Sequence, residues 1–316
     1  MPRAPDRELI KTLHAALEAF VADARNNNPQ PAAIRRIREG LASHASAVEA
    51  ARSSTDPIRT PLTTFDPGDP KTIGRMVSIA LLAQSTVPLG DVKPAYGSGV
   101  YAIYYHGNHP LYREISGTET PIYVGKADPA RDDASTTREQ GARLTGRLLE
   151  HAGTVLTAEA YADALPAHLT AIRLRDFSCR KLVCATNAQL VAEKHLIRMF
   201  WPIWNAETKA CWGMSKHGDS ATTRANKRSP WDVVHPGRVW ALDKRLVDSL
   251  TPDQIAKRVQ ETLTRVPPRR DRAALFEEML TGFRQSDGPS WQTNVSSVGE
   301  DAVGSEPDEA GGADGA

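Results

Sequence analysis

The sequence predicts an α+β fold in which a small, mainly antiparallel sheet of roughly three strands is flanked by helices, with further helices towards both ends of the chain. Three observations lead to this prediction. Apolar residues recur at helical spacing through most of the first ninety residues. Two short segments rich in β-branched and aromatic residues, 100–105 and 121–125, have the composition of strands. Helical spacing returns after residue 137, interrupted by one further strand-like region between residues 168 and 185.

Residues 1–90 are expected to form a helical N-terminal region. Leucine, isoleucine and phenylalanine recur at helical spacing over 9–21, and an asparagine-rich turn ends that helix. A second amphipathic segment covers 34–48. Asp69 and Pro70 make a favourable N-cap and first-turn pair for a third helix. Nothing in this region indicates catalysis, so the expected role of these helices is packing.

Residues 91–241 are expected to hold the core sheet. The strands at 100–105 and 121–125 should pair as an antiparallel hairpin around a long polar loop. Residues 168–175 and 180–185 are expected to form a further strand or strand pair, broken between them. The core sheet is therefore predicted to be small and largely antiparallel.

Helices are expected to connect and follow these strands. One is predicted over 137–152 and a shorter one over 158–165, and Asn187 is expected to cap a helix that runs to Phe200. Residues 242–284 have the pattern of two or three polar C-terminal helices. Residues 285–316 are poor in apolar residues and rich in glycine, serine and acids, which predicts a disordered acidic tail.

The composition is that of an ordinary globular protein. The chain has 316 residues, of which 40% are hydrophobic and 24% charged, and this excludes a collagen, a disulfide-stapled miniprotein and a wholly disordered chain. No run approaches the roughly 18 apolar residues of a membrane span, and the first residues lack the apolar stretch of a signal peptide. Three cysteines, an odd number without a CxxC pair, favour a cytosolic protein without disulfides.

The formal net charge of +1 hides an uneven distribution of charge. Residues 285–316 contain seven acidic and no basic residues, so residues 1–284 carry eight more basic than acidic groups. Within that body, residues 209–240 hold six basic groups against two acids. A basic body is compatible with a polyanionic partner, although an excess of this size over this length is a weak signal.

Six polar residues follow one another in an order that is more informative than any of them alone. Two tripeptides on the predicted strands, Gly99-Val100-Tyr101 and Tyr123-Val124-Gly125, are followed by four polar residues. Those four are Arg147 and His151, four apart on the next predicted helix, then Glu193 on a later helix and Asn205 twelve residues beyond it. This succession resembles the GIY-YIG nuclease superfamily, and in particular its branch of type II restriction endonucleases that cut the GC-rich palindrome CCGCGG.

Longer stretches resemble that branch as well, and together they span roughly residues 85–241. These stretches are 99–106, 121–127, 200–205 and 228–238. The resemblance implies that residues 91–241 form a GIY-YIG nuclease core with DNA-contacting loops.

The resemblance implies that Tyr101 is the general base for metal-assisted hydrolysis of a phosphodiester, and that Tyr123 orients the water or a phosphate oxygen. An unperturbed phenol has a pKa of about 10 and is a poor base at neutral pH. Cationic neighbours or a proton acceptor must therefore favour the phenolate. His151 is a candidate acceptor, and Lys126 is close enough to Tyr123 in sequence to contribute positive charge.

The other residues are implied to handle phosphate and metal. The planar guanidinium of Arg147 suits a phosphate, and His151 would share its helical face. Glu193 would bind one Mg²⁺ ion per active site, and Asn205 would position the substrate or the surroundings of the glutamate. Taken singly, each has an ordinary structural interpretation. The two tyrosines would be aromatic residues of a sheet, and Arg147 and His151 would lie on a solvated helix face. Glu193 would be a surface carboxylate and Asn205 a turn residue. Only their joint order favours a nuclease site.

Basic residues after Asn205 are the candidates for DNA contacts, and they interleave with Trp212, Trp231 and Trp240. They are Lys209, Lys216, Arg224, Lys227, Arg228 and Arg238. Arginine is a natural bidentate partner of guanine in the major groove, but most such residues in DNA-binding proteins contact phosphate. The sequence does not identify which of them reads a base.

The resemblance also implies partners and alternatives. A palindromic site in double-stranded DNA requires two active sites, which predicts at least a homodimer. The protein is expected in a prokaryotic cytoplasm beside a methyltransferase of the same specificity. Two alternatives stay open: a structure-selective repair or mobile-element nuclease of the same fold, and a non-catalytic DNA-binding module. The sequence has neither a Walker loop nor an HExxH motif, and a zinc site built from its scattered cysteines is improbable.

Overall fold

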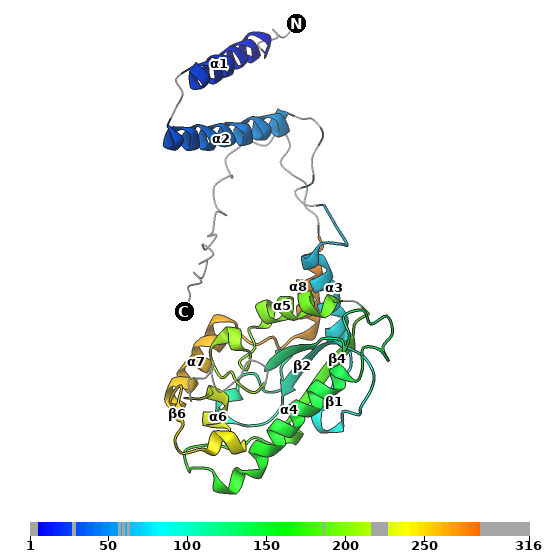
Figure 1. The fold of residues 1–316 in the computed structure, drawn as a ribbon. Coiled ribbons are helices and arrows are strands. Elements are labelled where there is room, and N and C mark those ends of the chain that lie inside the picture. The colour runs from blue at the N-terminus through cyan, green and yellow to red at the C-terminus, as the bar shows by residue number, and fades with distance from the viewer. Residues whose placement is uncertain are drawn as a thin grey trace. The chain divides into compact units, whose positions relative to one another are not determined.

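The computed structural model describes residues 6–26, 30–55, 58, 61, 64–185, 187–215 and 227–284. The chain divides into two compact units, one that includes residues 1–64 and one made of Phe65–Arg284. The second unit combines helices with an antiparallel sheet, as the α+β prediction requires (Figure 1). The acidic tail expected over 285–316 lies outside the described residues.

The N-terminal unit contains two helices, α1 (Asp6–Asn26) and α2 (Pro31–Thr55). The first helix ends at Asn26, where the asparagine-rich stretch of the sequence begins. Apolar side chains on α1 are exposed, with Leu9 at 68% and Leu13 at 62% of their full accessibility, and no described residue of α2 is buried. These helices therefore leave the apolar faces seen in the sequence open in the part of the unit that the structure describes.

The core sheet has four strands in the order β1-β4-β2-β3, all paired antiparallel. The strands are β1 (Val87–Pro88), β2 (Gly99–Tyr105), β3 (Tyr123–Ala127) and β4 (Phe177–Val183). The expected hairpin between β2 and β3 is confirmed. Within the part of this core sheet that the structure describes, the two-residue strand β1 at one edge is an addition to the predicted strands.

Strand β4 begins where the sequence indicated a break. Residues 174–176 form a 3-10 turn instead of a strand, and the strand starts at Phe177, which pairs with Tyr105 of β2. The Phe177 side chain is buried in the core, and the Asp176 carbonyl accepts a hydrogen bond from the His106 N–H. Burial of this aromatic ring therefore fixes the start of the strand, and of the expected strand or strand pair the structure has one continuous strand.

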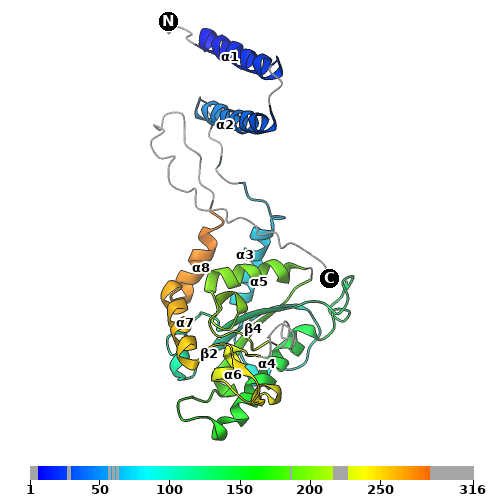
Figure 2. The ribbon, with the colours of Figure 1, turned by 60° about the vertical axis from the view of Figure 1, so that its left-hand side comes forward.

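Strand β2 lies at the centre of a three-layer arrangement, and all seven of its residues are buried. Tyr101, Ile103 and Tyr105 point into a cluster with α4 (Arg143–Ala160), because alternate residues of a strand face opposite sides of the sheet. The even-numbered residues Val100, Ala102 and Tyr104 pack against α3 (Pro70–Ala83) and α5 (Ala188–Phe200). Figures 1 and 2 show α4 on one side of the sheet and α3 with α5 on the other.

Helix α3 begins as the sequence predicted, with the Asp69 carboxylate accepting a hydrogen bond from the Thr72 N–H at 3.1 Å. It packs closely on α5, since a Cβ at Gly74 would lie 2.8 Å from the Val191 carbonyl oxygen. Although this helix falls within the region 1–90 that the sequence grouped together, it belongs to the compact unit that carries the sheet. Asn187 stands at the N-cap of α5 as expected, without a capping bond from its side chain.

Helix α4 runs from Arg143 to Ala160, later and longer than the predicted helix over 137–152. The residues before it form a loop in which Gly141 has φ +72°, a left-handed conformation that glycine tolerates and that precludes an earlier start. At its other end α4 includes the start of the short helix expected over 158–165, leaving only a 3-10 turn at Ala162–Ala164.

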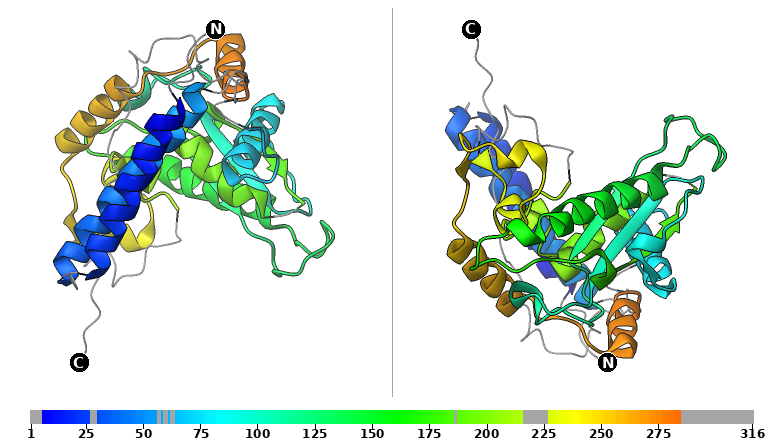
Figure 3. Two further views of the ribbon diagram at one scale, coloured as in Figure 1. Left: turned by 90° about the horizontal axis from the view of Figure 1, so that it is seen from above. Right: turned by 90° about the horizontal axis from the view of Figure 1, so that it is seen from below.

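The C-terminal part of the second unit wraps around the core. It consists of α6 (Pro230–Val234), α7 (Pro252–Arg265) and α8 (Arg272–Thr281), with a small parallel pair β5 (Lys227–Arg228) and β6 (Val247–Asp248). Apolar residues of α7 join the cluster on the α4 side of the sheet, and those of α8 join the α5 side. Figure 3 shows α7 and α8, in gold and orange, following the edge of this unit. The predicted C-terminal helices are thus present and packed.

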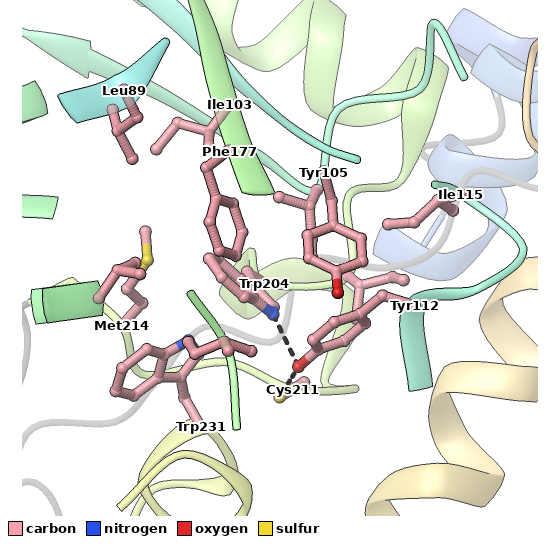
Figure 4. Packing of buried hydrophobic residues seen from close by; sticks show 14 of the residues in the cluster. Leu89, Ile103, Tyr105, Tyr112, Ile115, Phe177, Trp204, Cys211, Met214 and Trp231 are labelled. Carbon is pink, nitrogen blue, oxygen red and sulfur yellow. Dashed lines mark hydrogen bonds between the residues drawn. The ribbon is translucent and has the colours of Figure 1, made fainter. Parts of the chain in front are cut away.

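An aromatic cluster anchors the segment that follows α5 (Figure 4). The Tyr112 hydroxyl accepts a hydrogen bond from Trp204 Nε1 at 3.0 Å and lies 2.6 Å from His235 Nε2. The Cys211 thiol lies 3.4 Å from the same hydroxyl. The three cysteines are free and buried, in agreement with a protein without disulfides.

None of the helices in the described residues combines the length and apolar character needed to span a membrane.

Candidate active site

One pocket of about 500 Å³ opens in the second unit beside strands β2 and β3. Five of the six residues predicted to be catalytic line it, and the sixth, His151, contacts one of the five. The five are Tyr101, Tyr123, Arg147, Glu193 and Asn205. Lys126 also lines the pocket. The fold therefore brings together residues from two strands, two helices and a loop that are separated by as many as 104 positions.

The two tyrosines lie on neighbouring strands, with Tyr101 opposite Gly125 and Tyr123 opposite Ile103. Their ring centroids are 6.2 Å apart. A Cβ at position 125 would lie 2.5 Å from the Tyr101 hydroxyl oxygen, closer than any side chain allows. The glycine of the second tripeptide therefore makes room for the tyrosine of the first.

Tyr101 contacts His151 directly. Its hydroxyl lies 2.7 Å from His151 Nε2, and both residues are buried. Burial raises the pKa of the Tyr101 phenol well above its usual range, and the nearby Tyr123 and Glu193 raise it further, while Arg147 opposes them. The neutral phenol is therefore the stable form at neutral pH, and the adjacent imidazole nitrogen is positioned to accept its proton.

Arg147 lies one helical turn before His151 on α4, so both side chains face the strands. Its Nη2 donates a hydrogen bond to Ser215 Oγ at 2.7 Å, and its Nη1 pairs with the Glu150 carboxylate. The guanidinium also acts on both phenols, lowering the pKa of Tyr123 as well as that of Tyr101 against the effect of burial. Arg147 therefore acts as a cation on both phenols.

Glu193 projects from α5 and carries the most perturbed carboxylate of the pocket. Burial raises its pKa to about 7, and the acidic neighbours Glu207 and Asp128 raise it as well. Lys126 opposes this increase through its charge and through a backbone hydrogen bond. Lys126 also pairs with Asp128, so its charge acts on the carboxylates of the pocket more than on Tyr123, the residue to which sequence proximity assigned it.

Asn205 is buried and bound to the sheet. Its Oδ1 accepts a hydrogen bond from the Val124 N–H and its Nδ2 donates one to the Val124 carbonyl, both at 2.9 Å. The preceding residue adds a third contact, from the Trp204 N–H to the Ile122 carbonyl at 3.0 Å. Asn205 thus fastens its loop to β3, directly beside Tyr123.

The basic residues expected to contact DNA are in different environments. Lys209 and Lys227 are exposed, and Arg228 pairs with Asp248 at 2.6 Å. Arg238, another candidate for DNA contact, is only 6% exposed and forms an ion pair with Asp232, so its side chain lies inside the protein. Lys216 and Arg224 lie outside the described residues.

Several pocket residues had no signal in the sequence. Ser215 contacts Arg147 although 68 positions separate them, and Glu207 and Asp128 act on Glu193 from two different loops. None of the three belongs to a spaced motif, and serine or acidic residues in loops are common. Their positions follow only from the packing of the segments that carry them.

A metal ion in this pocket would have one strong protein ligand, the Glu193 carboxylate. In the described part of the chain, no three His, Cys, Asp or Glu side chains are close enough to form a metal site by themselves. Mg²⁺ does not need such a set, because it commonly binds one or two carboxylates and completes its shell with water and phosphate oxygens. Glu193 fits such an ion. Its carboxylate lines the pocket and its pKa is raised in the absence of a cation, and a bound divalent cation would favour the ionised form.

Comparison with known proteins agrees with this geometry. The family model of the Eco29kI GIY-YIG domain matches residues 93–263, which is more than half of the chain. The matched range contains β2, β3, α4, β4 and α5, and with them all six residues of the constellation. A search of curated proteins finds no match. The chain therefore belongs to the Eco29kI family of GIY-YIG restriction endonucleases, and it is a nuclease.

Proposed function

We propose that this protein is a type II restriction endonuclease that makes double-strand breaks at a fixed GC-rich palindrome, such as CCGCGG, by Mg²⁺-assisted hydrolysis. The observation that carries the proposal is the contact between the Tyr101 hydroxyl and His151 Nε2 in a pocket shared with Arg147 and Glu193. A general base, a phosphate-binding cation and a metal ligand are the groups that phosphodiester hydrolysis requires.

Tyr101 and His151 act together as the general base. Tyr101 takes a proton from the attacking water while its own hydroxyl proton passes to His151 Nε2. Burial makes a free phenolate unfavourable, so a tyrosine alone would be a weak base here. The 2.7 Å contact removes that difficulty, because the phenol never has to hold a full negative charge without a partner.

Arg147 and Tyr123 orient and neutralise the phosphate. The guanidinium has a planar array of donors that suits two phosphate oxygens. The Tyr123 hydroxyl lies in the same pocket and donates to the water or to a phosphate oxygen. Both residues stabilise charge that increases in the transition state, which is how such groups accelerate phosphoryl transfer.

Glu193 would hold one Mg²⁺ ion through its carboxylate, and water and phosphate oxygens would complete the ligand shell. When bound, the ion supplies Lewis-acid polarisation of the phosphate and stabilises the leaving 3′-oxygen. Lys126 helps to keep the Glu193 carboxylate ionised against the charges of Glu207 and Asp128. The glutamate must lose its proton to bind the ion. The Mg²⁺ concentration needed for half-maximal cleavage should therefore fall as the pH rises through about 7.

A palindromic site is cut on both strands by two copies of the active site, so the working enzyme is a homodimer. Exposed basic residues after Asn205, such as Lys209 and Lys227, contact the duplex. Enzymes of this class protect their host only when a methyltransferase of the same specificity modifies the host sites. The genetic partner is therefore a methyltransferase of the same specificity. The enzyme acts in a prokaryotic cytoplasm.

Digestion of a plasmid of known sequence tests the proposal. The purified protein in Mg²⁺ buffer should give discrete fragments, and sequencing of their ends should reveal one palindrome. Glu193→Ala should abolish cleavage while leaving DNA binding largely intact, whereas Glu39→Ala on α2 should cleave normally. Random nicking, or higher activity on branched than on linear duplex, would contradict the restriction assignment. Binding without scission at any Mg²⁺ concentration would contradict catalysis itself.

A further inference from the structure

A buried ion pair between Asp232 and Arg238 lies behind one wall of the pocket. Their side chains are 0% and 6% exposed. Arg238 Nε contacts Asp232 Oδ1 and Arg238 Nη2 contacts Asp232 Oδ2, both at 2.6 Å, so the pair is bidentate. Ser229 supports it by donating to Asp232 Oδ2 at 2.5 Å. Burying two charges has a desolvation penalty that good geometry only offsets, so such a pair is weak evidence for a purely stabilising role.

The donors of Arg238 that remain bind the backbone of another segment. Nη2 donates to the Gly213 carbonyl at 2.7 Å and Nη1 donates to the Met214 carbonyl at 3.3 Å. The guanidinium also lies 5.2 Å from the ring centroids of Trp231 and Trp240. A pair of apolar residues could fill the same volume, but it could not hold these two carbonyls.

The segment that Arg238 holds, Trp212 to Ser215, forms part of the pocket wall. The Trp231 N–H donates to the Trp212 carbonyl at 3.0 Å. Gly213 has φ +113°, and a Cβ there would lie 2.2 Å from Ser229 Oγ. The backbone at Gly213 therefore packs directly against Ser229, the residue that hydrogen-bonds Asp232. The contacts of Arg238 with the Gly213 and Met214 carbonyls, and of Ser229 with Gly213, therefore fix the position of Ser215, the next residue.

Ser215 ends this segment and contacts the proposed phosphate-binding group. Its Oγ accepts the 2.7 Å hydrogen bond from Arg147 Nη2, and the serine side chain lowers the pKa of Tyr123 against the effect of burial. Arg147 is held on its other side by Glu150. An arginine side chain has many rotamers, so the Ser215 contact selects the one that faces the two tyrosines.

We propose that Asp232 and Arg238 are positioning residues that act through the Gly213 and Met214 carbonyls and the Ser215 hydroxyl to orient the Arg147 guanidinium for phosphate. This inference rests on the catalytic roles given under the proposed function. It assigns Arg238 a role in orienting the active site from inside the protein, in place of a contact with a base or a phosphate. Ser215 is the only member of this chain of contacts that touches a catalytic side chain directly.

Single-turnover cleavage of a duplex that contains the mapped site tests the role of Ser215. Ser215→Ala should lower the rate constant by about tenfold to a hundredfold, the value of one charge-assisted hydrogen bond, with less than a threefold change in DNA dissociation constant. Ser215→Thr, which keeps the hydroxyl, should recover most of the rate, and Ser46→Ala on α2 is the matched control. A Ser215→Ala rate equal to that of the wild type would overturn the inference.

Double variants distinguish positioning from loss of stability. Arg238→Lys keeps a positive charge beside Asp232 but removes the guanidinium that binds the Gly213 and Met214 carbonyls. Arg245, which pairs with Asp243 at the surface, provides the control variant Arg245→Lys. If Arg238 acts through Ser215, the loss in the double variant Arg238→Lys/Ser215→Ala should equal the larger single loss. In an Arg147→Lys background, Ser215→Ala should change the rate less than twofold.

Multiplicative losses in either double variant would overturn the positioning role, whatever the thermal stability of Arg238→Lys. A wild-type protein that fails to cut duplex DNA in Mg²⁺ would instead overturn the proposed function. The two failures are therefore distinguishable in the same assay.

Discussion

At the scale of single residues, Glu193 combines an unfavourable charge with a position in the wall of the pocket. Its pKa is raised to about 7 by burial and by Glu207 and Asp128, so the folded protein binds a proton that the unfolded chain releases near its ordinary value of 4.5. Stability is therefore lost as the pH rises from that ordinary value through the folded pKa. This cost to the metal-free protein agrees with the proposed role of Glu193 as a metal ligand.

Glu193→Gln should stabilise the metal-free protein, and only at the higher pH. At pH 8 the Glu193 carboxylate is ionised although its buried, acidic surroundings disfavour the charge, and the amide removes that charge. The gain in unfolding free energy should be as much as about 3 kcal/mol. At pH 5 the carboxyl is already protonated and the gain should be small. Urea unfolding in EDTA at the two pH values measures this difference. An equal gain at both values, or a loss at pH 8, would contradict the raised pKa.

Tyr101→Phe should remove cleavage activity without disturbing the sheet. The ring remains in the buried cluster, but no hydroxyl is left to pass a proton to His151, so the rate should fall by about 10²-fold to 10⁴-fold. The rate of single-turnover cleavage at saturating enzyme measures this loss.

Tyr104→Phe is the matched control, because Tyr104 lies on the same strand and faces the opposite side of the sheet. It should cleave at nearly the wild-type rate. Equal losses in the two variants would indicate that both act by disturbing β2, and would argue against a proton-transfer role for Tyr101.

At the scale of elements, the outer edge of β3 is closed by a side chain in place of a strand. β3 stands at the end of the sheet order, and Asn205 binds both backbone groups of Val124 on that edge. An exposed edge would otherwise leave these groups without a partner beside the pocket. One asparagine thus satisfies the strand and holds its own loop against it.

Asn205→Ala should destabilise the protein by about 2 kcal/mol, because it leaves a buried N–H and a buried carbonyl of Val124 unpaired. Cleavage should fall together with stability, since Tyr123 is the neighbouring residue on β3. Chemical denaturation and the cleavage assay on the same preparation measure both effects. An unchanged unfolding free energy would show that the edge contacts contribute nothing.

At the scale of the whole molecule, the unit formed by Phe65–Arg284 has the contacts of an independent domain. Its first and last residues meet within the unit, where the rings of Phe65 and Phe283 lie 6.2 Å apart and Arg75 donates to the Gly282 carbonyl. It includes both buried clusters and the whole pocket. The helices α1 and α2 contribute no residue to either cluster.

Deletion of residues 1–64 should therefore leave a protein that unfolds in one cooperative transition, with a melting temperature within about 3 °C of the full chain. Deletion of residues 1–83 is the contrasting variant. It removes α3 and with it Leu81 and Leu82, both fully buried, and it should not fold stably. Calorimetry of the two truncated proteins decides the matter. Loss of the transition in the shorter deletion would place α1 and α2 within the same cooperative unit.

Much of the fold follows from local patterns along the chain. The Asp69–Pro70 helix start, the Gly99–Tyr105 strand and the hairpin to Tyr123 were all predictable, because capping, β-branched composition and turn residues act over a few neighbours. The boundaries of α4 and β4 were not predictable. They depend on a left-handed glycine and on the burial of Phe177, which are decided by distant segments.

The sequence by itself determines the chemical groups available to the site, because the succession of Tyr101, Tyr123, Arg147 and Glu193 resembles that of the GIY-YIG nucleases. Only the tertiary structure decided what surrounds these groups. It placed Lys126 beside the acids, buried Arg238 against Asp232 and brought Ser215 to Arg147. The physical reason is that residue type sets what a side chain can do, whereas burial and long-range contacts, which no local pattern encodes, set its charge, orientation and partners.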